Sequence, residues 1–149
     1  MRAVLQRVRG ARLSVDGKKV SEIGEGLVVY LGVGKGDGES ECEAVARKIC
    51  SLRIFSDEAG KMNLSLLSGG KEALIVSQFT LYGDASHGNR PSFTEAEQPD
   101  RAKMLYERVC ELTESGGVKT ARGVFGADML IEQECDGPVT IVYEVRPKQ

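Results

Sequence analysis

The chain has 149 residues, a length at which a domain can bury a core without disulfides or metals. Its formal net charge of −2 excludes nucleic-acid binding driven by global charge. A hydrophobic fraction of 41% and a charged fraction of 28% are ordinary for a globular protein, so we predict a single domain over residues 1–149.

The sequence favours a cytoplasmic protein. The N-terminal segment lacks the apolar region of a signal peptide, and no apolar run approaches the length of a membrane span. The scattered cysteines, without a CxxC pair, are typical of reduced thiols. With one histidine and no cysteine cluster, we expect no zinc site and no cofactor. The four cysteines are Cys42, Cys50, Cys110 and Cys135.

The N-terminal segment is locally basic. Residues 1–19 hold six cations against Asp16 alone, a local charge of +5. A basic edge of this kind could meet a phosphate backbone. Outward residues of surface strands are often Lys or Arg, however, and this is the commoner explanation of the charge. The six cations are Arg2, Arg7, Arg9, Arg12, Lys18 and Lys19.

The first third of the chain predicts extended segments at residues 3–8, 12–15, 19–23 and 27–33. Gly10 ends the first segment. Asp16-Gly17 between the second and the third is a hairpin signal. The fourth segment is continuously apolar, which predicts a central strand covered on both faces.

Two segments have the apolar stripe of an amphipathic helix. The first runs from Glu39 to Leu52, and an i,i+4 pair of Glu43 and Arg47 supports it. The second begins at Pro99 and ends at Gly116-Gly117. The two stripes consist of Cys42, Val45, Ala46, Ile49 and Leu52, and of Ala102, Leu105, Tyr106, Val109 and Leu112.

The segment Leu74–Tyr82 predicts a strand that turns polar in its C-terminal half. Alternation would place Ser77, Phe79 and Leu81 on one face and Gln78, Thr80 and Tyr82 on the other. These polar groups are either satisfied within the structure or form a site at the end of a core strand.

The remaining segments complete a mixed sheet. Residues 118–125 are expected to be extended, and residues 129–134 and 139–145 to pair around a turn at Cys135–Pro138. Residues 83–98 form a long polar loop, and such loops are often functional. Because strands outnumber helices, we predict an α+β fold of mixed, mostly antiparallel β layers with two main helices packed on one side.

The residues offer no activated nucleophile. We expect His87, the only histidine, to be an exposed loop residue, and Cys135 has no second histidine to activate it. What remains is the hydroxyls of Ser77 and Thr80, the amide of Gln78 and backbone N–H groups. Such groups can hold a carbonyl oxygen as charge develops on it, but they are poor bases. They suit a substrate that is already reactive or that carries its own nucleophile.

Seven motifs in one order resemble the D-aminoacyl-tRNA deacylases from end to end. They are Gln6-Arg7-Val8, Gly26–Val29, Arg53–Asp57, Gly60–Asn63, Ser77–Leu81, Arg90–Phe93 and Asp136–Thr140. The resemblance implies a cytosolic homodimer with β/β/α layers that hydrolyses the ester between a D-amino acid, or glycine, and the 3′ end of tRNA.

The resemblance also implies roles for individual residues. Ser77, Gln78, Phe79 and Thr80 would line the pocket, with the Phe79 N–H at the ester oxygen and the tRNA 2′-OH assisting. A cis Gly137-Pro138 pair would enter the partner subunit's pocket, accept the α-amino group and exclude L side chains.

Two further residues belong to this motif. Arg7 would brace it. Cys135 departs from the Asn that the family usually has two residues before the glycine, so the turn must be braced differently here.

Two other functions remain open on these residues. The chain could be a small-ester or peptide hydrolase with Thr80 or Ser77 as covalent nucleophile. It could instead be a non-enzymatic binding module whose polar strand end is structural.

Overall fold

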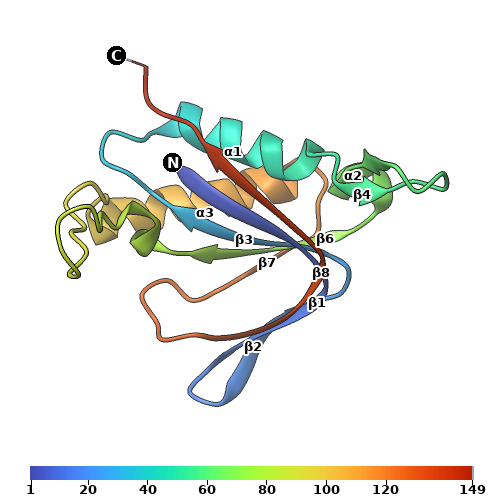
Figure 1. Ribbon diagram of the computed structural model, residues 1–149, viewed down its shortest axis with the longest axis horizontal. Coiled ribbons are helices and arrows are strands. Elements are labelled where there is room, and N and C mark those ends of the chain that lie inside the picture. Colours follow the sequence, from blue (N-terminus) through green and yellow to red (C-terminus); the bar gives the residue numbers. More distant parts are fainter. Residues whose placement is uncertain (149) are drawn as a thin grey trace.

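A curled sheet with two helices on one face makes up the computed structural model, which describes residues 1–148 (Figure 1). In chain order the elements are β1 (Arg2–Val15), β2 (Lys18–Ile23), β3 (Gly26–Gly32), α1 (Glu39–Ser51), β4 (Phe55–Ser56), β5 (Met62–Leu64), α2 (Leu66–Gly69), β6 (Glu72–Ser77), the 3₁₀ turn η1 (Phe79–Tyr82), α3 (Pro99–Ser115), β7 (Thr120–Arg122) and β8 (Leu130–Glu144).

The sheet is built around β1. The N-terminal half of β1 pairs antiparallel with β3, its C-terminal half pairs antiparallel with β2, and β8 runs antiparallel along its other edge. The sheet continues from β3 through the parallel strands β6 and β7. Figure 1 shows α1 and α3 above β3, β6 and β7, with the β1–β2 end folded underneath. The predicted α+β class, mostly antiparallel with two main helices on one side, is confirmed.

Strand alternation supplies two apolar cores. Leu27, Val29 and Leu31 of β3 pack in the core beneath the helices, whereas Val28 packs in a smaller core on the opposite face. All four side chains are fully buried, so β3 is covered on both faces as predicted. Burial of each such side chain contributes roughly 1.5–3 kcal/mol.

The two predicted helices are confirmed. Helix α1 ends at Ser51 with Leu52 as its C-cap, and α3 begins at Pro99 and ends before Gly116. Their predicted stripes face the core. The Glu43–Arg47 pair is not among the ion pairs of residues 1–148, so this part of the prediction is wrong.

The Asp16-Gly17 hairpin is confirmed. Asp16 has φ 51° and Gly17 has φ 77°, and a type I′ turn requires a positive φ at both central residues. The predicted strand end at Gly10 is wrong, because β1 continues through Gly10 with irregular register opposite β8. A glycine there lets the strand bend without breaking its pairing.

The predicted final strand pair is also wrong. Residues 130–144 form one strand, β8, which pairs along β1 on both sides of the Cys135–Pro138 segment. The register shifts next to Val8, so the segment bulges from a continuous strand instead of reversing it. Of the expected extended segment 118–125, only Thr120–Arg122 forms a strand, β7.

The segment that opens the candidate site differs most from expectation. Strand β6 stops at Ser77, and residues 79–82 form η1, so the predicted alternation of residues 78–82 between two faces is wrong. The Gln78 N–H donates to the carbonyl of Leu31 at 2.8 Å, the last backbone hydrogen bond to β3 among residues 1–148. Beyond it β3 ends, and the chain turns because no neighbouring strand remains to pair with.

The structure also bears on the membrane and thiol predictions. No helix in residues 1–148 is both long and apolar enough to cross a membrane. Cys42, Cys50 and Cys110 are buried free thiols, and Cys135 is exposed. Burial raises the pKa of Cys42 to about 12 and that of Cys110 to about 11.

Candidate active site

A cavity of about 730 Å³ opens where β3 and β6 end. Its walls come from the end of β6 and η1, from the loop at residues 93–99, and from the loop at residues 125–129. Four of the predicted site residues line it together: Ser77, Gln78, Phe79 and Thr80. The switch from strand to 3₁₀ turn is what brings these consecutive residues to one cavity.

The polar groups of η1 are poised as hydrogen-bond donors. The Gln78 side-chain amide donates to the Thr80 hydroxyl at 2.9 Å. Among residues 1–148, no backbone or side-chain acceptor takes the N–H groups of Phe79 and Thr80, as is usual for the first residues of a helical turn. Phe79 is 55% exposed, and its ring packs edge-on against Phe93, with ring centroids 5.1 Å apart.

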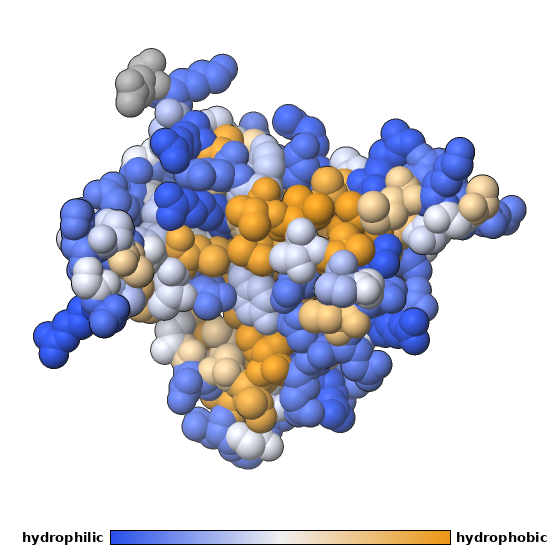
Figure 2. All heavy atoms as spheres, in the orientation of Figure 1, coloured by the Kyte–Doolittle hydropathy of each residue, from blue (hydrophilic) through white to orange (hydrophobic). Residues whose placement is uncertain are grey.

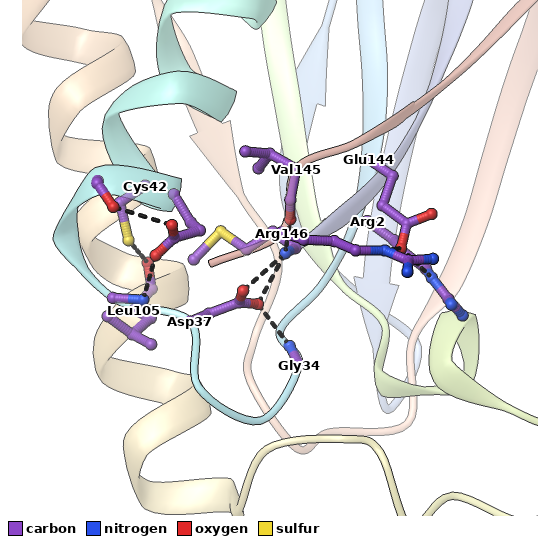
Figure 3. A network of polar contacts seen from close by, with 12 residues as sticks. Arg2, Gly34, Asp37, Cys42, Leu105, Glu144, Val145 and Arg146 are labelled. Carbon is purple, nitrogen blue, oxygen red and sulfur yellow. Dashed lines mark hydrogen bonds and ion pairs between the residues drawn. The ribbon is translucent and has the colours of Figure 1, made fainter. Parts of the chain in front are cut away.

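The loop beneath η1 is fixed by a buried ion pair, drawn in Figure 3. The Asp37 carboxylate accepts from the Gly34 N–H at 2.7 Å and lies 2.8 Å from the α-amino group of Met1. The Tyr82 ring of η1 packs on Gly34, where a Cβ would come within 2.6 Å of the ring. Burial raises the pKa of Tyr82 to about 12. Asp37 therefore supports the position of η1.

Tyr106 of α3 supports two walls of the cavity. Its hydroxyl donates to the Ile75 carbonyl at 2.7 Å and accepts from the Gly123 N–H at 3.2 Å. Its ring packs against Phe125, at the rim of the third wall. Burial raises the pKa of this buried phenol, which keeps the donor protonated. One side chain thus ties β6 to the loop that follows β7.

The structure places the other predicted residues outside this cavity. Gly137 and Pro138 are exposed, and the peptide bond between them is cis. Arg7 holds the turn: its Nε donates to the Asp136 carbonyl at 3.1 Å, and its Nη1 donates to the Ile54 carbonyl at 2.8 Å. Cys135 is paired with Val8 of β1, and its thiol accepts from the Gln133 side-chain amide at 3.1 Å. His87 is exposed, as expected.

The cations of the N-terminal segment are largely neutralised. Arg2 pairs with Glu144, Arg12 with Glu132, and both Arg7 and Arg9 with Asp136. Lys19 pairs with Glu22. These carboxylates come mainly from β8, whose pairing with β1 the sequence could not specify. The basic edge expected from composition is therefore offset by its strand partner.

None of the cavity's loop residues was assigned to the site from the sequence, although Phe93 lies in the matched motif Arg90–Phe93 and Glu97 in the polar loop at residues 83–98. Phe93, Glu97, Phe125 and Asp128 line the walls from loops with no periodic pattern. The Glu97 carboxylate accepts from the Gln98 N–H and lies 3.9 Å from Arg101. Among the described residues that line the cavity there is no lysine, arginine or histidine, so Glu97 and Asp128 make its charge acidic.

Comparisons with known proteins agree over nearly the full chain. Residues 4–144 match the family described as D-Tyr-tRNA(Tyr) deacylase. A "D-aminoacyl-tRNA deacylase" of Myxococcus xanthus is 54% identical over 97% of this chain and 94% of its own. A solved structure titled "c-Myc DNA Unwinding Element Binding Protein" has a TM-score of 0.94 and 39% identity, covering 99% of this chain and 100% of that one.

A second solved structure extends the fold comparison to a distant sequence. It is titled a "probable eukaryotic D-amino acid tRNA deacylase", has a TM-score of 0.82 and 20% identity, and covers 97% of this chain and 98% of its own. It shows the fold alone. With the family match across residues 4–144 and the 54% identity to a named member, the chain belongs to the D-aminoacyl-tRNA deacylase family of hydrolases.

Proposed function

We propose that the protein hydrolyses the ester between a D-amino acid, or glycine, and the 3′ end of tRNA, releasing the free amino acid and tRNA in the cytoplasm. The observation that carries the proposal is the cavity at the end of β6, which gathers donor groups but no activated nucleophile. Release of free D-tyrosine from D-Tyr-tRNA by the purified protein tests the activity itself.

The cavity suits an ester substrate that carries its own assisting group, the 2′-OH of the terminal ribose. Water adds to the carbonyl carbon, and the Phe79 N–H donates a hydrogen bond to the developing oxyanion. The C–O bond to the ribose then breaks as the 3′ oxygen gains a proton. The neighbouring 2′-OH of the same ribose orients the water, a task for which the cavity holds no histidine or lysine. Glu97 and Asp128 make the walls acidic, which favours a substrate with a protonated α-amino group.

Replacing Thr80 tests the rival in which it is the covalent nucleophile. A nucleophile needs a base to take its proton, but the Gln78 amide is a donor to the Thr80 oxygen. We expect Thr80→Ala to lower kcat for D-Tyr-tRNA by about tenfold or less, the loss of one hydrogen-bonding group. Thr94→Ala, outside the cavity, is the matched control. A loss on the order of 10⁴-fold or more would instead identify Thr80 as the nucleophile.

The proposal includes a homodimer, and the edge of the sheet supports it. Strand β8 is 15 residues long and among residues 1–148 pairs only with β1, leaving one edge free. Its Val142 is 74% exposed and its Leu130 is 64% exposed. Figure 2 shows apolar residues gathered in the middle of the face that Figure 1 views. Long exposed edges with apolar side chains are usually covered by another chain.

We expect gel filtration to give a mass near twice the 16.1 kDa of one chain. A two-fold arrangement would bury the same surface of both copies. Elution as a monomer at micromolar concentration would contradict the proposed dimer, and with it the selectivity that depends on a partner subunit.

In the proposed dimer, the exposed turn at Gly137-Pro138 selects the chirality of the substrate. The turn does not line the cavity of its own chain, so it can act only on the cavity of a second copy. There its backbone would occupy the space of an L side chain, while a D side chain or a glycine hydrogen is accommodated. Selection by exclusion explains why glycine is accepted along with D-amino acids.

Nucleic-acid binding without turnover is the second candidate. The solved relative at 39% identity is named for binding a DNA element. This candidate predicts binding of uncharged tRNA or DNA but no release of amino acid from any charged tRNA. The net charge of −2 applies to DNA and tRNA alike, so turnover and not binding separates the two candidates.

A further inference from the structure

A second hollow, of about 350 Å³, opens at the C-terminal end of α1. Its walls come from the last turns of α1, the residues that follow, and Tyr143 of β8. Within residues 1–148 the lining holds three cations and no acidic residue: Arg47, Lys48 and Arg53, with the hydroxyls of Ser51 and Tyr143 beside them. We call this hollow the basic pocket. Its charge is opposite to that of the cavity at the end of β6.

The charges of the basic pocket are not neutralised. Among residues 1–148, no carboxylate lies within ion-pair distance of Arg47, Lys48 or Arg53. This differs from β1, where Arg2, Arg7, Arg9 and Arg12 are all paired with carboxylates. The basic pocket is therefore a hollow lined by three cations that have no carboxylate partner among residues 1–148.

Two of the three cations are already held in place. Lys48 Nζ lies 5.1 Å from the centroid of the Tyr143 ring. Arg53 donates from Nε to the Asn63 carbonyl at 3.0 Å and from one Nη to the Asn63 side chain, while its other Nη has no acceptor among residues 1–148. A guanidinium positioned with a free nitrogen loses little entropy when it binds an anion.

We propose that the basic pocket binds a backbone phosphate of the tRNA, an inference that rests on the proposed function. A charged tRNA ends in an ester with a protonated amino group, which suits the acidic cavity, but the rest of the molecule is a polyanion. The acidic walls cannot hold its phosphates, so a separate cationic contact is needed. The basic pocket offers one, because its guanidinium and ammonium groups and its two hydroxyls can all donate hydrogen bonds to a phosphate.

The position of the basic pocket relates it to the partner's active site. Arg53 is followed by Ile54, whose carbonyl accepts from Arg7, and Arg7 also holds the Asp136 carbonyl at the Gly137-Pro138 turn. In the proposed dimer this turn enters the partner's cavity. Because the basic pocket and this turn belong to the same subunit, the proposal has that subunit supply both the turn and the phosphate contact for a tRNA whose ester lies in the other subunit.

The test compares two double variants of equal charge. Arg47→Gln with Lys48→Gln removes two cations of the basic pocket, and Lys18→Gln with Lys103→Gln removes two exposed cations elsewhere. At 0.1 M salt we expect the pocket variant to raise the Kd for uncharged tRNA about tenfold and to lower the slope of log Kd against log salt by about 0.9, the loss of one phosphate contact. The control pair should change Kd by less than about threefold.

Kinetics and competition separate the remaining outcomes. For D-Tyr-tRNA we expect the pocket variant to raise KM with kcat retained, because a phosphate contact is made equally in the ground and transition states. Equal loss of affinity in both double variants, or an unchanged Kd in the pocket variant, would overturn the proposal. Binding of millimolar inorganic phosphate to the pocket with unchanged tRNA affinity would also overturn it. Because Kd is measured with uncharged tRNA, absence of hydrolysis would contradict the proposed function without obscuring this result.

Discussion

Replacing Asp37 with alanine is expected to destabilise the protein by about 3–5 kcal/mol, the range seen when one partner of a buried ion pair is removed. The Asp37 carboxylate is 1% exposed and the α-amino group of Met1 is fully buried, so the variant would leave that ammonium group without its counter-ion. The Gly34 N–H would also lose its acceptor. Urea denaturation at fixed protein concentration measures the change in the free energy of unfolding.

An exposed ion pair gives the matched control. Arg12 and Glu132 lie 3.0 Å apart, and each side chain is 55% exposed. We expect Glu132→Ala to cost less than about 1 kcal/mol, because water screens the pair in the parent and solvates Arg12 in the variant. If both variants lost similar stability, the Asp37 network would not support the fold as inferred here. Because η1 packs on Gly34, Asp37→Ala should also lower the activity of the folded fraction.

Arg7→Ala is expected to lower kcat/KM for D-Tyr-tRNA by about 100-fold. The Arg7 side chain is 14% exposed and joins the Asp136 carbonyl to the Ile54 carbonyl, which fixes the turn that carries Gly137 and Pro138. Without it the turn can move, and a displacement of about 1 Å can cost a factor of this size. Single-turnover deacylation of D-Tyr-tRNA and L-Tyr-tRNA measures both rate and selectivity.

Arg9 provides the control because it faces the same carboxylate. It lies 3.7 Å from Asp136 with its side chain 72% exposed, and it makes no contact with the Ile54 carbonyl. Arg9→Ala should change kcat/KM by less than about threefold. An Arg7→Ala variant that keeps its urea midpoint and its full activity would show that the turn does not need this brace.

Local patterns were sufficient for the elements that bury one clear stripe or run. The periodicity of residues 39–52 and 99–112 predicts α1 and α3, and the apolar run at residues 27–33 predicts β3. In each case the pattern alone determines which side chains are buried. The positive φ values at Asp16 and Gly17 likewise follow from local turn chemistry.

Where local patterns predicted the wrong element, contacts between residues far apart in the sequence determine the structure. The polar segment after Ser77 has strand composition, yet it becomes η1 because β3 ends and Tyr82 packs on Gly34. The segment Asp136-Gly137-Pro138 has turn composition, yet β8 continues through it because β1 supplies a partner on both sides. Neither partner is near in sequence, so no local window contains the information.

The candidate site likewise has a part that local sequence predicts and a part that depends on long-range packing. The motif Ser77–Thr80 could be found from its polar composition at the end of an apolar strand. The loop at residues 83–98 could also be recognised as a functional segment, but its place in the cavity wall could not. Phe93 and Asp128 lie on loops whose position depends on α3 and on the Tyr106 contacts with Ile75 and Gly123. The basic pocket likewise needs α1 and Tyr143 of β8 to meet in space.

The most direct test of the account is a pair of deacylation time courses with D-Tyr-tRNA and L-Tyr-tRNA at equal concentration. If the exposed Gly137-Pro138 turn excludes L side chains from the cavity of the partner, the D ester is lost rapidly while the L ester decays at its rate without protein. Equal hydrolysis of the two esters would contradict selection by exclusion. No hydrolysis of either ester would contradict the proposed activity.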